Sequence, residues 1–166
     1  MNGAIELFER ALKIDPDHAI ALENLGNAYR QQKNWPEAER ALKRALALIP
    51  EDTQANYSLG MVYAEQNDTA RASQYLERAL AVRPDYPAAL NNLGIVYLRA
   101  GRRAEAIERF EESIRVAPEY DQSYLNLARL YAIEGDRQKA RGVLEELLKK
   151  HPDHVQALAE LNQLDR

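Results

Sequence analysis

Residues 87–120 read PAALNNLGIVYLRAGRRAEAIERFEESIRVAPEY, and the same pattern recurs along the chain every 34 residues. The period is marked by five prolines, Pro16, Pro50, Pro84, Pro118 and Pro152. A fixed period of about 20–50 residues is typical of proteins built from stacked structural repeats. Such proteins present long surfaces that bind other chains. The period therefore favours a binding surface over a catalytic pocket.

The repeat boundaries follow from placing each proline at position 32 of its repeat. This numbering predicts four full repeats, at residues 19–52, 53–86, 87–120 and 121–154. Residues 1–18 correspond to the second half of an earlier repeat, and residues 155–166 are expected to form a C-terminal capping helix. We expect all these parts to form a single solenoid domain.

Each repeat carries two stripes of apolar and small residues at helical spacing. Positions 4, 7, 8 and 11 share one face of a first helix, helix A, and positions 20, 24, 27 and 28 share one face of a second, helix B. Positions 8 and 20 hold small residues, such as Gly94 and Ala106. We therefore expect the two helices to approach closely there, where added bulk would overpack the contact. The tyrosines at position 11, such as Tyr97, are expected to pack in this contact and not to act as catalysts.

The sequence also predicts where helix A and helix B end. Asn67, Gly101 and Gly135 stand where helix A should end in a residue of left-handed conformation. Each proline then closes helix B and begins the turn to the next repeat.

This pattern resembles the tetratricopeptide repeat family. The third repeat carries the motif of that family as Leu90-x2-Leu93-Gly94-x2-Tyr97, then Ala106-x3-Phe110, then Pro118. The resemblance covers essentially the whole chain. It implies an all-α fold, a right-handed solenoid of antiparallel helix pairs with the A helices lining the concave side. Asn56 at position 4 and Leu147 at position 27 depart from the pattern, and we expect local repacking around them.

Positions 2, 5, 6, 9, 12 and 13 of helix A face away from helix B. Few of them are charged, whereas many carry amides or large apolar side chains, unlike a simple solvated face. An exposed stripe of this kind suits an extended peptide. Alternatively, several of its apolar residues pack between neighbouring A helices. The predicted peptide-binding residues are Asn24, Asn27, Tyr57, Ser58, Met61, Asn91, Asn92, Ile95, Arg99, Leu125, Asn126 and Arg129.

Position 6 forms a row of small polar side chains, Asn24, Ser58, Asn92 and Asn126. An Asn amide both donates and accepts, so such a row can hold a peptide main chain whatever its sequence. The row is similar to one in the tetratricopeptide arm of O-linked N-acetylglucosamine transferases, which implies a grip on substrate polypeptides. The alternative is that Asn-Leu-Gly is the family consensus here.

Two functions remain open on this evidence. The first is a non-catalytic protein-interaction scaffold that holds an extended peptide or a partner helix in its concave groove. The second is a substrate-recruiting arm of an enzyme such as an O-linked N-acetylglucosamine-type glycosyltransferase. Chaperone-binding members of the family use Lys or Arg at positions 2, 5 and 6, but position 6 is never basic here. A carboxylate ligand would lack its charge-assisted bonds, so this third mode is disfavoured.

Composition narrows the range of partners. The net charge of −4 disfavours nucleic acid, and the absence of cysteine excludes disulfides and thiolate chemistry. No apolar run approaches the roughly 20 residues that span a bilayer. The first residues lack a basic region followed by an apolar core, so we expect no signal peptide and favour a cytoplasmic location. We also expect no membrane insertion and no cofactor.

The segment His151-Pro-Asp-His154 superficially resembles a pair of metal ligands. It lies in the turn between repeats, in the place that Asp15-Pro16-Asp17-His18 occupies earlier in the chain. We therefore predict a helix-capping turn and no metal site. No phosphate loop, nucleophile elbow or Ser/His/Asp set is visible, so we expect no enzymatic activity.

The two ends of the chain carry complementary half-repeats. Residues 2–15 have the pattern of a helix B, with Ile5, Phe8 and Leu12 on its apolar face. Residues 155–165 have the pattern of a helix A, with an apolar face of Val155, Leu158, Leu161 and Leu164. This predicts weak head-to-tail self-association through residues 2–15 and 155–165. The polar Asn162 and Asp165 indicate partial adaptation as a cap.

Overall fold

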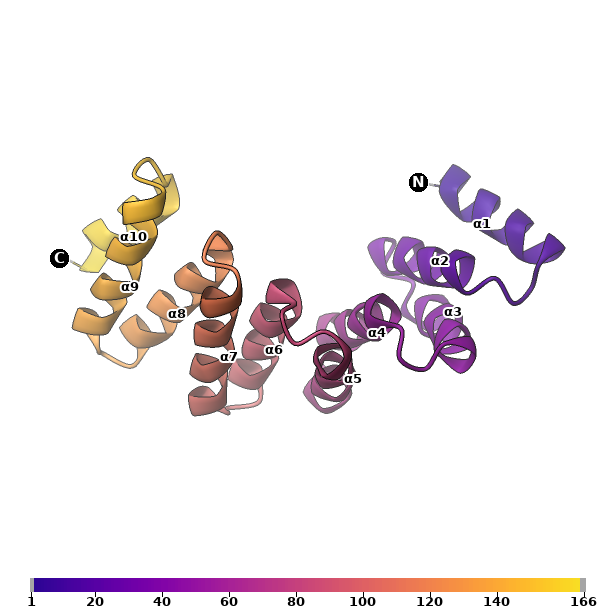
Figure 1. Cartoon of the computed structure of the whole chain (residues 1–166), viewed down its shortest axis with the longest axis horizontal. Helices are drawn as coiled ribbons and strands as arrows, with labels where there is room; N and C mark the ends of the chain where they lie inside the picture. Colours follow the sequence, from indigo (N-terminus) through magenta and orange to yellow (C-terminus); the bar gives the residue numbers. More distant parts are fainter. Residues whose placement is uncertain (1, 165–166) are drawn as a thin grey trace. The chain divides into compact units, whose positions relative to one another are not determined.

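The computed structural model describes residues 2–164, and within that range the chain folds into helices without a β-strand (Figure 1). The chain divides into two compact units, residues 1–84 and 85–166, which we call the N-terminal unit and the C-terminal unit. The N-terminal unit contains α1 (Asn2–Ile14), α2 (Ala19–Gln31), α3 (Trp35–Leu48), α4 (Thr53–Glu65) and α5 (Thr69–Val82). The C-terminal unit contains α6 (Pro87–Arg99), α7 (Arg103–Val116), α8 (Asp121–Ile133), α9 (Arg137–Lys150) and α10 (Val155–Leu164).

Neighbouring helices pack in antiparallel pairs within each unit. In the N-terminal unit α2 packs on α3 and α4 packs on α5, and in the C-terminal unit α6 packs on α7 and α8 packs on α9 (Figure 1). Each pair is one predicted helix A followed by one predicted helix B. The predicted all-α fold of paired helices is therefore confirmed, while the single solenoid domain stays a prediction.

In three of the four pairs the contact depends on glycine at position 8, whereas the α8–α9 pair has Ala128 there. A Cβ atom on Gly26 would lie 2.5 Å from Cγ of Leu42, and one on Gly94 would lie 2.6 Å from Cε1 of Phe110. Non-bonded carbon atoms essentially never approach so closely, so a larger residue would force the opposing buried side chain or the helix itself to shift. Leu42 and Phe110 are fully buried. The predicted close approach of helices A and B is confirmed.

Helix A ends in a left-handed residue in four repeats. The backbone φ angle is 63° at Asn67, 78° at Gly101 and 84° at Gly135, as predicted. It is also 57° at Lys33, which the sequence did not predict. A residue with a Cβ atom costs roughly 1–2 kcal/mol in this conformation. The following amide, Asn34 N–H, still donates to Tyr29 O at 2.9 Å, so the turn into helix B imposes the conformation.

Helix B ends two residues before each proline, as α3 does at Leu48 before Pro50. A side-chain cap then begins α2, α4 and α10, whereas α6 and α8 begin without one. The Asp52 carboxylate accepts the Ala55 amide at 2.8 Å, and the His18 Nδ1 atom accepts the Ala21 amide at 3.2 Å. These bonds satisfy backbone donors that an isolated helix would leave unpaired.

Two of the position-11 tyrosines link helices of successive repeats. The Tyr29 hydroxyl donates to Glu9 at 2.8 Å, and the Tyr131 hydroxyl donates to Glu111 at 3.2 Å. The hydrogen bond to Glu9 and partial burial raise the pKa of Tyr29, while burial and the nearby Glu111 carboxylate raise the pKa of Tyr131. Both tyrosines remain neutral near pH 7, and their hydrogen bonds hold helix A against helix B of the preceding repeat.

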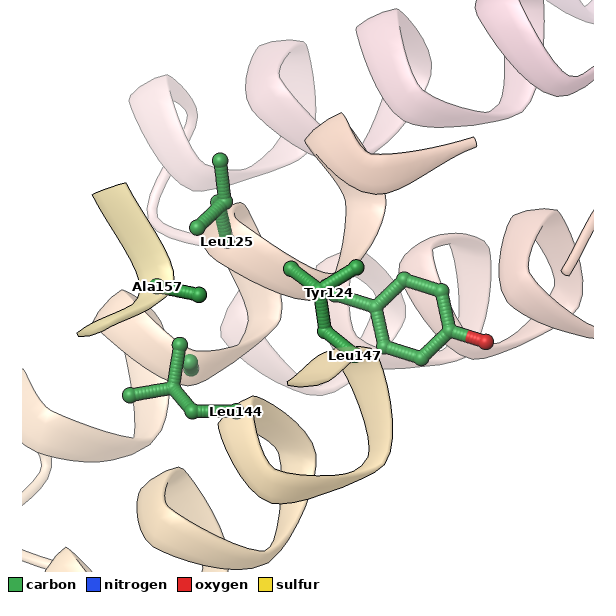
Figure 2. Packing of buried hydrophobic residues seen from close by; sticks show 6 residues of the cluster. Tyr124, Leu125, Leu144, Leu147 and Ala157 are labelled. Atoms are coloured by element: carbon green, nitrogen blue, oxygen red, sulfur yellow. The ribbon is translucent and has the colours of Figure 1, made fainter. Parts of the chain in front are cut away.

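The core of the C-terminal unit joins α8, α9 and α10. Its buried residues are Tyr124, Leu125, Ala128, Leu144, Leu147 and Ala157 (Figure 2). Leu161 and Leu164 of α10 pack against this cluster. The helix α10 therefore docks through Leu161 and Leu164, so only part of its predicted apolar face stays open. Val155 and Leu158 remain exposed, at 81% and 41%. Asp165, which we expected to help cap this end, lies outside the described residues.

The helix α1 packs on α2 through its predicted apolar face. Ile5, Phe8 and Leu12 are half-buried, whereas Leu7 and Ile14 are 62% and 87% exposed. Among the helices formed by residues 2–164, none is long and apolar enough to cross a membrane.

Candidate binding surface

In the N-terminal unit, the predicted stripe runs along α2 and α4. Asn24 and Asn27 of α2 are partly exposed, and the Asn27 amide donates to Glu23 at 3.3 Å. Burial, followed by the nearby Asp52 carboxylate, raises the pKa of Glu23. An ion pair between Arg30 and Glu65 joins the two helices. The stripe therefore presents amides beside a partly desolvated carboxylate.

In the C-terminal unit, the amides of α6 and α8 bind each other. The Asn126 Nδ2 atom donates to Asn91 Oδ1 at 2.8 Å, and Asn91 is only 4% exposed. Two buried hydroxyls also bind each other nearby, where Ser123 Oγ donates to Ser113 Oγ at 2.7 Å. Asn126 thus uses one of its two donors to stabilise the packing of α8 on α6.

Three predicted site residues do not reach the surface. Ser58 is 1% exposed, Asn91 is 4% exposed and Leu125 is fully buried. Asn91 lies beneath its bond from Asn126, and Leu125 packs in the cluster that includes Ala157 of α10. The expectation of an exposed stripe is wrong at these three positions. Leu125 packs against a neighbouring A helix, α10, instead of facing a ligand. This is the alternative that the sequence left open for the apolar residues of the stripe.

The other predicted site residues keep some exposure, so their role in peptide binding stays a prediction. The half-exposed ones are Asn24, Asn27, Tyr57, Met61, Asn92, Ile95 and Asn126, and the exposed ones are Arg99 and Arg129. Of the position-6 row, Asn24, Asn92 and Asn126 are accessible. With Ser58 buried, the row offers fewer amides to a ligand than the sequence indicated.

A pocket of about 660 Å³ opens between α8 and α10, entirely within the C-terminal unit. We call it the α8–α10 pocket. Its walls are mainly apolar and include small side chains. The lining residues are Ala128, Arg129, Ala132, Ile133, Arg137, Leu144, Gln156, Ala159, Glu160, Gln163 and Leu164.

Charged groups stand at the edge of the α8–α10 pocket. Arg129 donates to Glu160 Oε1 through Nε at 2.9 Å and through Nη2 at 2.6 Å, which ties α8 to α10. Gln156 also donates to Glu160, at 3.4 Å. Arg129 neutralises the charge of Glu160, and the pocket lining contains a second arginine, Arg137. The charged side chains of the lining therefore sum to one positive charge. Ile133, which is 77% exposed, adds an apolar edge.

Of the residues that line this pocket, only Arg129 belongs to the site residues predicted from the sequence. The α10 residues Gln156, Ala159 and Glu160 occupy positions 2, 5 and 6 of the helix A pattern, so the same rule could have found them. The prediction of a capping helix over residues 155–166 leaves them out of the predicted site. A helix that caps the core can also line a groove with its other face.

The His151 and His154 segment is a cap, as predicted. His154 Nδ1 accepts the Ala157 amide at 3.2 Å, so in the neutral imidazole the proton resides on Nε2. This Nε2 atom lies 3.4 Å from Asp121 Oδ2, and His151 Nε2 lies 3.3 Å from Asp121 Oδ1. A protonated Nε2 has no lone pair for a metal ion. This tautomer therefore favours the capping interpretation.

Comparison with known proteins agrees with this architecture. A family model described as tetratricopeptide repeat matches residues 1–51, 19–85, 51–119 and 85–153. A crystal structure of MamA is similar with a TM-score of 0.83 and 29% identity, over 91% of this chain and 88% of that one. A crystal structure of YrrB, titled as a TPR protein with an unusual peptide-binding site, is similar with a TM-score of 0.76 and 26% identity, over 93% of this chain and 80% of that one. No curated protein matches significantly. The repeat period, the paired helices and the family match lead to one conclusion: the chain belongs to the tetratricopeptide repeat family.

Proposed function

We propose that this protein is a non-catalytic interaction scaffold that binds an extended peptide segment or a partner helix of another protein. The binding surface is the accessible part of the helix A stripe, and its anchor is the α8–α10 pocket. The observation that carries the proposal is this pocket, an open apolar cavity with an arginine–carboxylate edge on the face that the A helices present.

The chemistry of the pocket suits a peptide side chain. Its volume of about 660 Å³ lies within the range of roughly 300–1,000 Å³ that ligand pockets occupy. Ala128, Ala132 and Ala159 leave room for an apolar anchor. The guanidinium of Arg137 at the rim can pair with a carboxylate next to that anchor. The structure therefore favours ligands with a large apolar residue beside an acidic one.

A known structure supports the same class of function. YrrB, which is similar to this chain over most of its length, is described by its title as having an unusual peptide-binding site. Tetratricopeptide repeats as a class use extended concave surfaces for binding.

A peptide array tests the proposal. The 166-residue chain is applied to an array of peptides with varied apolar and acidic residues, and the affinity of each hit is measured by fluorescence anisotropy. Ala159→Trp places a large side chain at an exposed position in the pocket wall. We expect it to weaken binding by at least about tenfold, equivalent to roughly 1.4 kcal/mol.

The matched control is Ala104→Trp, an exposed alanine of α7 outside the pocket lining. It should leave the affinity unchanged. Peptides that bind Ala159→Trp as tightly as the native chain would show that the anchor lies elsewhere. An array without any hit would contradict the scaffold function itself.

A further inference from the structure

We propose that one face of α1 is a docking site for a helix of a partner protein that carries the motif Leu-Gly-x2-aromatic. The face consists of Ala4, Leu7, Phe8 and Ala11, which share one side of the helix at spacings of three and four residues. We call it the α1 face. None of its residues belongs to the helix A stripe or to the α8–α10 pocket, so the inference is independent of the proposed function.

The α1 face is open because, among the described residues, no helix A precedes α1. The helix packs instead on α2, the helix A of the following repeat, where its Glu9 carboxylate accepts the Tyr29 hydroxyl at 2.8 Å. Helical spacing directs the α1 face away from Glu9, so this contact leaves it uncovered. Ala4 and Leu7 are exposed, Leu7 at 62%, and Phe8 and Ala11 are only half-buried.

The same positions are covered in each of the four helix pairs. Ala4, Phe8 and Ala11 occupy positions 20, 24 and 27 of the repeat. In each pair helix B packs on helix A with these positions at most 2% exposed. The residues concerned are Ala38, Leu42, Ala45, Ala72, Leu76, Ala79, Ala106, Phe110, Ser113, Ala140, Leu144 and Leu147. The molecule therefore shows which element covers such a face, namely a helix A.

Phe8 requires a glycine in the docking helix. Of the four full repeats, only the third has phenylalanine at this position, as Phe110. Its ring lies against Gly94 of α6, where a Cβ atom would come within 2.6 Å of the ring. A larger residue opposite Phe8 would be overpacked in the same way. Leu93, the residue before this glycine, is 1% exposed, so a leucine completes the apolar contact.

Leu7 favours an aromatic residue three positions after that glycine. Leu7 occupies position 23 of the repeat, and in the α4–α5 pair this position is Tyr75. The Tyr75 ring stacks on Tyr63, at position 11 of helix A, with the ring centroids 5.6 Å apart. An aromatic ring at position 11 of the docking helix would therefore cover Leu7 and remove its apolar surface from water.

The chain's own α10 meets these requirements poorly. It has the pattern of a helix A, but Asn162 stands where the glycine should be. Its amide is larger than glycine and would be desolvated against the Phe8 ring without a hydrogen-bond partner. A second copy is therefore a weak occupant, in agreement with the weak head-to-tail contact expected from the sequence. The α1 face suits a helix of another protein better.

A stapled peptide with the sequence of α6, residues 87–99, tests the site. It carries the motif as Leu93-Gly94-x2-Tyr97, and the staple joins positions 91 and 95, on the side away from helix B. The staple holds the helix, because so short a helix is marginal in water. Fluorescence anisotropy of the labelled peptide measures its binding to the 166-residue chain.

We expect saturable binding that Leu7→Glu in the chain weakens by at least about tenfold. Leu7 is exposed, so this change should leave the fold intact. The matched control is Lys13→Glu, at an exposed position on another side of α1, and it should leave the affinity unchanged. Two other peptides test the motif without any change to the chain. Gly94→Leu in the peptide should weaken binding by at least about tenfold, and so should a stapled peptide of the α10 sequence, residues 155–164.

Four results would overturn the proposal. The first is the absence of saturable binding at chain concentrations up to about 0.1 mM. The second is equal binding of the native and Gly94→Leu peptides, and the third is equal binding of the α10 peptide, which would assign the face to a second copy. The fourth is binding that Leu7→Glu leaves unchanged. If Ala159→Trp weakens that binding instead, the peptide lies in the α8–α10 pocket, and the proposed function stands without this second site.

Discussion

At the scale of single residues, glycine at position 8 sets the distance between the helices in three of the four pairs. A Cβ atom on Gly94 would lie 2.6 Å from a buried Phe110 ring, which cannot move aside as a flexible side chain could. We expect Gly94→Ala to lower the free energy of unfolding by about 1–3 kcal/mol through overpacking. The midpoint of urea denaturation measures this change.

Gly142 offers a matched control in the same unit. It lies inside α9, and a Cβ atom there would meet nothing within 4 Å. Gly142→Ala should therefore raise stability by about 0.5–1 kcal/mol, because alanine loses less backbone entropy in a helix. Equal effects of the two substitutions would mean that the contact with Phe110 does not limit helix packing.

At the scale of helices, aspartate caps couple stability to pH. Asp68 and Asp136 accept the backbone amides of Arg71 and Lys139, each at 3.0 Å. These hydrogen bonds lower the pKa of both carboxyls below the usual value. A lowered pKa in the folded state stabilises the protein above the unfolded pKa, and this contribution is lost as the pH falls through the folded value. Stability should therefore decrease below about pH 4.

Thermal melting between pH 7 and pH 2 checks this expectation. Replacing both aspartates by alanine should lower the melting temperature at pH 7 and flatten its decrease in acid. Asp153→Ala, which changes an exposed turn carboxyl, should leave the acid profile unchanged. A double variant with the full native decrease would assign the acid sensitivity to other groups.

At the scale of the whole molecule, the predicted self-association remains to be tested. Leu7 and Ile14 of α1 and Val155 of α10 are exposed apolar residues on the two segments concerned. We expect weak head-to-tail contact between copies of this 166-residue chain at high concentration. Light scattering over a concentration series measures it, and Leu7→Glu should suppress it. Leu7 is the appropriate residue because Phe8 is half-buried, so a charge at Phe8 would also disturb folding.

The control for this experiment is Lys13→Glu, which changes charge on an exposed part of α1 without altering an apolar residue. A strictly monomeric native chain at millimolar concentration would contradict the prediction. So would association that Leu7→Glu leaves unaltered.

The sequence by itself determined the period, the helix pairs and the ends of most helices. These features depend on local chemistry: the proline at position 32 cannot continue a helix, and Gly101 and Gly135 tolerate left-handed backbone. The contact between Gly94 and Phe110 was also predictable, because helical spacing places both on the facing stripes of one pair. Apart from the period itself, each of these inferences involves residues within a single repeat.

Only the tertiary structure decided which residues of the stripe a ligand can reach. Asn91 and Leu125 satisfy the pattern of an exposed position, yet neighbouring A helices in the C-terminal unit cover them. Lys33 adopts a left-handed conformation because the turn after α2 imposes it, although its side chain disfavours it. The α8–α10 pocket depends on side-chain volumes brought together from separate helices. Helical spacing specifies a direction for each side chain, whereas burial and cavity volume depend on what packs against it.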